Sequence, residues 1–67
     1  MNIEVYFERE QTTKKIEFSG ITVNDLLKQL NVNPETVLVT KNNEVVTEDE
    51  TLENNDKLEL LNVVSGG

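Results

Sequence analysis

The stretch that decides the fold is Lys57-Leu58-Glu59-Leu60-Leu61-Asn62-Val63, near the end of the printed sequence. Alternating apolar residues predict a β-strand, because successive side chains of a strand point to opposite faces. Here the second face also carries apolar residues, Leu61 and Val63, which makes the segment more apolar than a half-exposed edge strand. We therefore predict that this last strand lies in the middle of a sheet.

The first eighteen residues predict a β-hairpin that would flank this strand. Residues 2–8 alternate apolar and polar side chains, and residues 14–18 do so again, with Ile16 and Phe18 facing inward. The polar residues 9–13 separate the two runs. Two alternating runs joined by a short polar link are typical of a hairpin.

A single amphipathic helix is predicted after Gly20. Thr22 is a favourable N-cap residue, and Asp25 stands three positions later, where a capping box places its acidic residue. One apolar stripe follows at helical spacing, formed by Val23, Leu26, Leu27 and Leu30. Asn31 is a plausible helix end, and Pro34 prevents continuation soon after it.

The rest of the chain predicts two further strands, at residues 36–40 and 44–47, around an Asn42-Asn43 turn. We expect Glu48-Asp49-Glu50 to be a solvated loop that Leu52 attaches to the core. The element order is then β-β-α-β-β-β, in which a central last strand runs parallel to the first. This is an α+β fold of the β-grasp (ubiquitin-like) type, a mixed sheet packed on one helix. We expect residues 1–64 to form this domain and residues 65–67 to form a flexible tail.

Composition narrows the classes of function. The 67 residues include no cysteine and no histidine, so the chain offers neither a thiol nucleophile nor the usual general base. A formal charge of −7 argues against direct nucleic-acid binding, which depends on cations. No apolar run is long enough to cross a membrane and no leader is recognisable, so we expect a cytoplasmic protein. We assign no catalytic residue, no metal ligand and no cofactor.

Gly66 and Gly67 are the last two residues of the sequence. A free carboxylate on Gly67 would be the least hindered acyl group that a protein can offer, and glycine can enter a cleft in which any Cβ would collide. The alternative is an ordinary frayed terminus. Gly-Gly on its own does not decide between these readings.

With the fold added, the chain resembles the ubiquitin-like sulfur carriers of prokaryotes. These include the thiamine-biosynthesis sulfur carrier, the small subunit of molybdopterin synthase and the small archaeal modifier proteins. The resemblance covers the full length and rests on the order of elements and on three segments. These are Asn33-Pro34-Glu35-Thr36-Val37, Asp56-Lys57-Leu58-Glu59-Leu60-Leu61 and the ending Val63-Val64-Ser65-Gly66-Gly67. Family members often have an Asp-Gly-Asp turn where this chain has Asn54-Asn55-Asp56, and asparagine tolerates positive φ at modest cost.

The resemblance implies a mechanism centred on Gly67, with Gly66 needed for its approach. An E1-like adenylating enzyme uses ATP to activate the Gly67 carboxylate. A sulfur donor then yields a thiocarboxylate for a sulfur-accepting biosynthetic enzyme, or the acyl group passes to a lysine of a target protein. The carrier itself is not an enzyme. The sequence does not choose among thiamine, molybdopterin, tRNA sulfur transfer and protein conjugation. The alternative is a non-covalent β-grasp interaction module with an incidental Gly-Gly end.

A docking patch is predicted on the helix-free face of the sheet. If Leu58 and Leu60 point inward, Leu61 and Val63 point to the opposite face, where Leu38 of a neighbouring strand joins them and Tyr6 borders them. Clustered exposed apolar residues commonly mark interaction sites. The alternatives are scattered surface residues, which are normal, or a register shifted by one residue, which would exchange the two faces.

Overall fold

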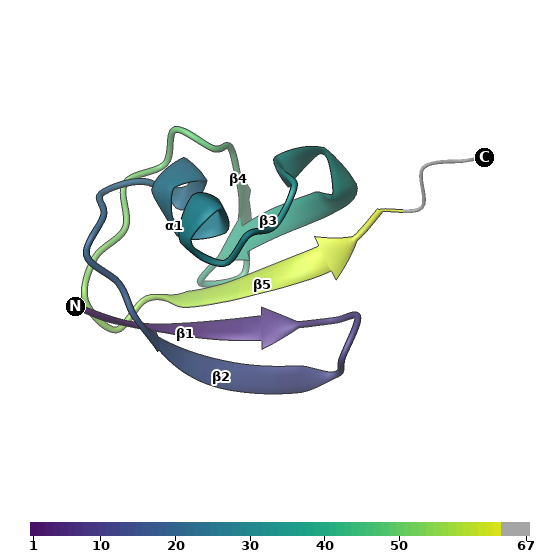
Figure 1. Ribbon diagram of the computed structural model, residues 1–67, viewed down its shortest axis with the longest axis horizontal. Coiled ribbons are helices and arrows are strands. Elements are labelled where there is room, and N and C mark those ends of the chain that lie inside the picture. Colours follow the sequence, from purple (N-terminus) through teal and green to yellow (C-terminus); the bar gives the residue numbers. More distant parts are fainter. Residues whose placement is uncertain (64–67) are drawn as a thin grey trace.

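A computed structural model describes residues 1–63 of the chain. In this range the polypeptide forms one mixed β-sheet, one α-helix and one short 3₁₀-helix, in the predicted order (Figure 1). The elements are β1 (Asn2–Phe7), β2 (Thr12–Glu17), α1 (Val23–Gln29), η1 (Pro34–Thr36), β3 (Val37–Lys41), β4 (Glu44–Val46) and β5 (Lys57–Asn62).

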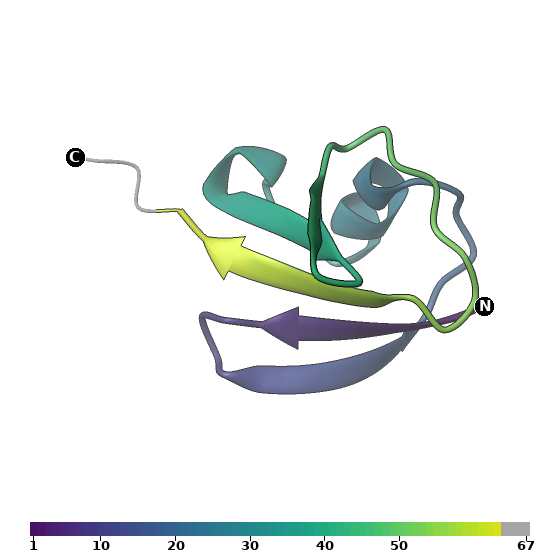
Figure 2. The same ribbon diagram turned by 180° about the vertical axis from the view of Figure 1, so that it is seen from behind.

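The strand order is β2-β1-β5-β3-β4, which places β5 in the centre of the sheet. β5 runs parallel to β1 and antiparallel to β3, while β1–β2 and β3–β4 are antiparallel pairs. Figures 1 and 2 show α1 lying across one face of the sheet. We call the opposite face, which α1 does not cover, the open face. The predicted β-grasp architecture is confirmed, including the central, parallel last strand.

The hydrophobic core lies between α1 and the sheet. Both inward residues of β5, Leu58 and Leu60, are almost completely buried. The other buried apolar residues are Ile3, Val5, Phe18, Val23, Leu26, Leu27, Val39 and Leu52. The predicted helical stripe is therefore confirmed for its first three positions, and Leu30 packs partly buried against the same cluster.

The start of α1 is fixed by hydrogen bonds in the first turn of the helix. The Asp25 backbone amide donates to Thr22 Oγ1 at 3.3 Å, and the Thr22 amide donates back to the Asp25 carboxylate at 3.1 Å. This is the predicted capping box. The pKa of Asp25 lies below its usual value, chiefly because its carboxylate accepts a hydrogen bond from the Ile21 amide and, second, one from the Thr22 amide. Asn31, at φ 59°, follows the helix end.

Several element boundaries differ from the predicted ones. β2 begins at Thr12 rather than Lys14, because the hairpin turns tightly through Gln11, whose φ is 51°. α1 ends at Gln29, before Pro34 is reached. Residues Pro34–Thr36 form η1, in which Asn33 Oδ1 accepts from the Glu35 amide, so β3 begins at Val37. β5 ends at Asn62. The predicted tail, residues 65–67, lies outside the described residues, and the domain boundary stays a prediction.

Candidate functional site

Two leucines of the predicted patch lie side by side on the open face. Leu38 and Leu61 are direct neighbours in the antiparallel β3–β5 ladder. Leu38 is 40% exposed and Leu61 is half-buried, whereas the adjacent Val39 and Leu60 are buried against the helix. The predicted register is thus confirmed, and a one-residue slip is excluded.

Val63 and Tyr6 lie at different margins of this leucine pair. Val63 follows the end of β5 and is 47% exposed. Tyr6 is half-buried and is paired with Glu59 rather than with Leu61 in the β1–β5 ladder. It therefore borders the leucines diagonally, as predicted.

Sequence reasoning missed Val45, the most exposed large apolar residue of the described chain at 66%. Val45 is paired with Thr40 in the β3–β4 ladder. Thr40 lies two residues after Leu38 in β3 and therefore on the same face, so Val45 is also on the open face. Two valines stand next to each other in β4, and periodicity alone does not say which points inward. The β3–β4 register settles it, since Val46 pairs with buried Val39. We define the apolar patch as Leu38, Val45, Leu61 and Val63, with Tyr6 at its border.

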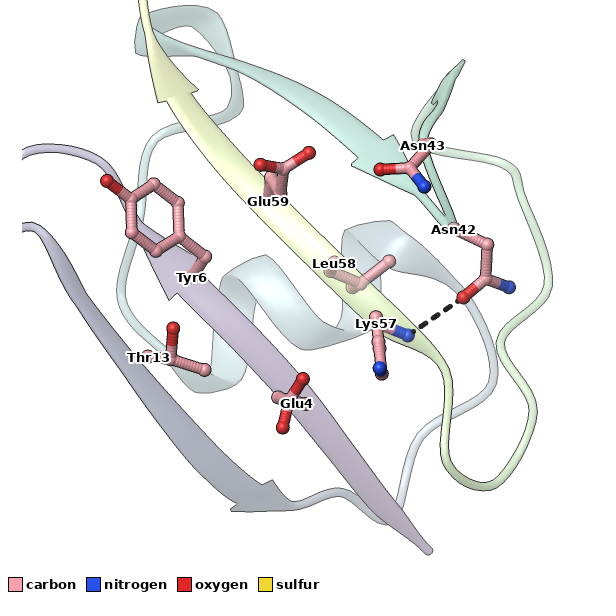
Figure 3. A pocket seen from close by; sticks show the side chains of 8 residues that line it. All are labelled: Glu4, Tyr6, Thr13, Asn42, Asn43, Lys57, Leu58 and Glu59. Carbon is pink, nitrogen blue, oxygen red and sulfur yellow. Dashed lines mark hydrogen bonds between the residues drawn. The ribbon is translucent and has the colours of Figure 1, made fainter.

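Beyond Tyr6 the open face becomes polar. A shallow hollow of about 310 Å³ lies there (Figure 3), and Figure 3 shows Tyr6, Glu59 and Lys57 around it. Thr40 Oγ1 donates to Glu59 Oε1 at 2.9 Å, which satisfies one of the carboxylates of this region. The apolar part of the open face therefore lies toward the Asn62 end of β5 and the β4 edge, and the polar part toward the Lys57 end of β5 and β1.

The end of β5 is held by hydrogen bonds on both sides. On the β1 side, the Asn62 amide donates to Glu8 Oε1 at 2.9 Å. On the β3 side, the Val63 amide donates to the Thr36 carbonyl at 3.1 Å. The last described residue therefore stands in a fixed position relative to the sheet. The predicted reactive residues Gly66 and Gly67 lie outside the described residues.

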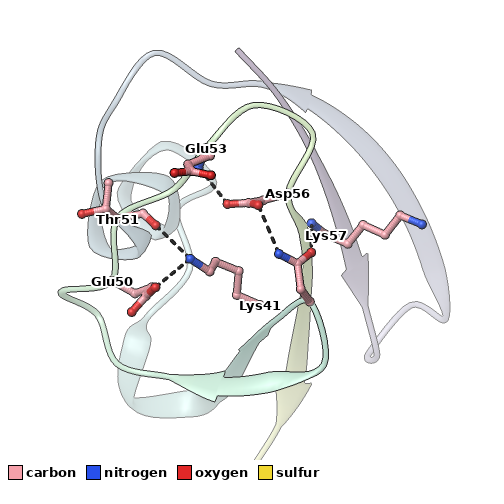
Figure 4. A network of polar contacts seen from close by, with 7 residues as sticks. Lys41, Glu50, Thr51, Glu53, Asp56 and Lys57 are labelled. Atoms are coloured by element: carbon pink, nitrogen blue, oxygen red, sulfur yellow. Dashed lines mark hydrogen bonds and ion pairs between the residues drawn. The ribbon is translucent and has the colours of Figure 1, made fainter.

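A second polar cluster ties the loops at the opposite end of the sheet (Figure 4). Asp56 is buried, and its carboxylate accepts from the Glu53 amide at 2.7 Å and from Asn42 Nδ2 at 3.2 Å. Lys41 Nζ donates to Glu50 Oε2 at 2.6 Å, which raises the pKa of Lys41 above its usual value. The predicted solvated loop is confirmed for Glu48 and Asp49, which are exposed, whereas Glu50 is only partly exposed because it pairs with Lys41.

Within residues 1–63 no group of three or more histidine, cysteine or acidic side chains could hold a metal ion. The same part of the chain contains no helix long and apolar enough to cross a membrane. The apolar patch adjoins the end of β5.

Comparison with known proteins identifies the family. The model of the ThiS family matches residues 5–67. The chain belongs to the ThiS family. The sulfur carrier protein TtuB of Thermus thermophilus is 34% identical over 55 residues, covering 81% of this chain and 85% of that protein. Among solved structures, the thiamine biosynthesis protein ThiS of Geobacter metallireducens has a TM-score of 0.71 at 27% identity, with both chains covered completely. SAMP1 of Haloferax volcanii has a TM-score of 0.74 at 21% identity, again over 100% of both chains, which shows a shared fold.

The predicted resemblance to ubiquitin-like sulfur carriers and modifiers is thus confirmed at the level of family and fold. The one noted departure from the ThiS pattern also has a structural explanation. Asn55 stands where family members often have glycine, and it adopts a φ of 72°. Its amide donates to the Asn2 carbonyl at 2.7 Å, which fixes the turn against the start of β1. An asparagine here keeps the turn that leads into β5.

Proposed function

We propose that this ThiS-family protein is a sulfur carrier or protein modifier that acts through the carboxylate of Gly67. The observation that carries the proposal is the family match, which runs through Gly66 and Gly67 and is continuous with the central strand β5. The name of the Thermus relative, a sulfur carrier protein, supports the same class of function. Glycine at both positions allows the backbone to enter a narrow active-site cleft.

The chemistry proposed at Gly67 begins with ATP bound to an E1-like activating enzyme. The carboxylate attacks the α-phosphorus, pyrophosphate leaves, and an acyl-adenylate forms. A sulfur nucleophile then attacks the acyl carbon and AMP leaves. A thiolate gives a thioester with the partner. A persulfide gives an acyl disulfide, and a second thiol then cleaves its sulfur–sulfur bond, which leaves a thiocarboxylate on Gly67 and a disulfide on the donor. A lysine amine that attacks the activated carbonyl instead forms an isopeptide bond.

The carrier supplies none of the reacting groups except the carboxylate. Its sequence has no cysteine or histidine, so the nucleophile and the general base of each step must come from partners. We accordingly propose that the protein is a substrate of the activating enzyme rather than an enzyme, and that it needs no cofactor of its own. The partners are the E1-like enzyme, a sulfur donor, and either a sulfur-accepting biosynthetic enzyme or target lysines.

We also propose that the apolar patch docks the activating enzyme. Leu38 and Leu61 share the open face near the end of β5, and the exposed Val63 follows that end directly, with residues 64–67 next in the sequence. An enzyme that covers this face would therefore hold the carrier next to the group that it must activate. The net charge of −7 favours a partner surface with basic residues around the apolar contact.

The test is incubation with a ThiS-type activating enzyme, ATP and a sulfur donor, followed by intact-mass and C-terminal peptide analysis. We expect a mass increase equal to the exchange of one oxygen for sulfur, located on Gly67. A variant lacking Gly66 and Gly67 should fold normally and should not be adenylated, and extension beyond Gly67 should be almost as damaging. Full adenylation of the truncated variant would refute the proposal.

A non-covalent interaction module is the competing function, and it gives a different result. It would bind its partner through the open face with an unchanged intact mass, and truncation of Gly66-Gly67 would leave that affinity intact. For the docking face, Leu38→Glu should raise the KM for the carrier with little effect on kcat. Thr13→Glu, which adds the same charge to the same face at the β2 edge, is the matched control.

A further inference from the structure

The side chain of Glu8 replaces a missing backbone acceptor at the end of β5. β1 and β5 form a parallel ladder over residues 4–7 and 57–60, and the Glu8 amide continues it by donating to the Leu60 carbonyl at 3.1 Å. In a regular parallel ladder the next bond would run from the Asn62 amide to the Glu8 carbonyl. That carbonyl is already engaged, because it accepts from the Gln11 amide at 3.1 Å within the hairpin turn.

The turn therefore removes the acceptor that Asn62 needs, and the Glu8 carboxylate supplies another at 2.9 Å. Figure 1 shows the geometry: β1 ends and bends toward β2, while β5 continues past it. A charged acceptor makes a hydrogen bond roughly twice as strong as a neutral one. The exposed Glu8 side chain thus accepts the hydrogen bond that a main-chain carbonyl would accept in a regular strand.

The opposite side of β5 is held independently. Val63 donates to the Thr36 carbonyl at 3.1 Å, and η1 fixes Thr36 through a hydrogen bond from its amide to the Asn33 carbonyl at 3.0 Å. Consecutive amides of a strand point in opposite directions, so these two bonds hold neighbouring peptide groups from both sides. The peptide unit between Asn62 and Val63 cannot rotate without breaking one of them.

We propose that Glu8 is a positioning residue that fixes the orientation of the backbone at Asn62 and Val63, from which the sequence continues to Gly67. This inference rests on the function proposed for Gly67. Residues 64–67 follow Val63 directly in the sequence, so the orientation of the Val63 peptide group sets the direction in which a chain of at most about 14 Å begins. Loss of alignment between reacting groups lowers the rate of a step without requiring any loss of binding. Glu8 acts through the backbone of β5 and contacts no reacting atom.

Three variants separate this role from simple effects of charge and stability. Glu8→Ala removes both the charge and the acceptor, whereas Glu8→Gln removes the same charge and keeps an acceptor oxygen. Glu10→Ala is the control in the same turn, because the interaction that the Glu10 side chain makes with the described residues is an exposed ion pair with Lys14 at 3.7 Å. Such exposed pairs contribute little to stability.

The first measurement is by NMR on the isolated protein and does not depend on any activity. In Glu8→Ala we expect hydrogen exchange of the Asn62 amide to accelerate about tenfold, equivalent to about 1.4 kcal/mol, and the residual dipolar coupling of the Val63 amide to shrink. In Glu8→Gln the Asn62 exchange rate and the Val63 coupling should both be close to those of the wild type. Glu10→Ala should change neither the exchange rate nor the coupling. An unchanged Asn62 amide and Val63 coupling in Glu8→Ala would overturn the positioning role.

The second measurement is steady-state adenylation with the activating enzyme. We expect Glu8→Ala to lower kcat about tenfold while the KM for the carrier stays within about twofold, and Glu8→Gln to recover most of kcat. If Glu8→Ala and Glu8→Gln lose activity equally, charge rather than position is responsible and the inference is wrong. If the wild-type protein is not adenylated at all, the proposed function fails, and the NMR result still decides whether Glu8 orients the end of β5.

Discussion

Neighbouring leucines in β5 should respond in opposite ways to the same substitution. Leu60 is 2% exposed and packs in the core, whereas Leu61 is half-buried on the open face beside Leu38. Removing a buried leucine side chain costs about 2–5 kcal/mol. Full burial of a leucine contributes about 1.5–3 kcal/mol, so a half-buried one contributes about 1 kcal/mol. A domain of 67 residues has a free energy of unfolding of about 3–10 kcal/mol in total.

These magnitudes predict that Leu60→Ala folds only marginally and that Leu60→Glu, which also buries a carboxylate, does not fold. Leu61→Ala and Leu61→Glu should both fold. The assay is urea denaturation followed by circular dichroism. With a slope of about 1 kcal/mol per molar, Leu60→Ala should lower the midpoint by about 3 M and Leu61→Ala by about 1 M, with unchanged slopes.

Activity with the activating enzyme separates the pair further. Leu61→Glu should raise the KM for the carrier although the protein is folded, because it places a charge in the apolar patch. The reasoning is refuted if Leu61→Glu unfolds the domain while Leu60→Glu is silent, since both the assignment of faces and the docking patch depend on the same register.

Three further predictions concern stability. Gly20→Ala should destabilise the fold by at least about 1 kcal/mol, because an added Cβ would stand 2.6 Å from Asp25 Cβ and 2.7 Å from the Phe18 ring; urea midpoints check this. Asn55→Ala should cost about 1 kcal/mol and Asn55→Gly should be neutral or slightly stabilising, because the residue has a φ of 72°; thermal melts of the two variants decide it. Asp25 has a lowered folded-state pKa, so its contribution is complete above its unfolded pKa and is lost as the pH falls below about 4. The gap in urea midpoint between wild type and Asp25→Ala should therefore be present at pH 6 and shrink toward pH 3.

Each of these stability predictions has an outcome that contradicts it. A Gly20→Ala protein as stable as wild type would show that the Phe18 ring can move aside at no cost. Equal melting temperatures for the alanine and glycine variants of Asn55 would remove the backbone explanation of the turn. A gap between wild type and Asp25→Ala that does not change with pH would mean that the carboxylate's charge contributes nothing to the capping box.

The alternation within β5 carried enough information to predict most of the fold. A period of two assigned Leu58 and Leu60 to one face and Leu61 to the other, and the apolar character of both faces placed the strand centrally. The helix start was equally predictable, because the capping box is local and its two partners are three residues apart. Local periodicity and local hydrogen bonds are properties that a sequence displays directly.

Interactions between distant segments were not predictable in the same way. Glu50 was expected in solvent, but Lys41 of β3 lies close enough to pair with it once β4 has turned back. The hydrogen bond from Asn62 to Glu8 joins residues 54 positions apart, and nothing in the composition of either segment signals it. Val45 was missed for a related reason, since only its pairing with Thr40 reveals its face.

One strand therefore connects the stability of this protein to the function proposed for it. The side chains of β5 that point inward hold the core, those that point outward form part of the patch, and its last amides are fixed by Glu8 and Thr36. Because these roles fall on different atoms of the same strand, we expect mutations to separate them: inward side chains should affect stability, outward side chains KM, and the end of the strand kcat. A variant that lowers kcat alone, at a residue other than Glu8, Thr36, those of β5 or those of residues 63–67, would require a determinant outside this arrangement.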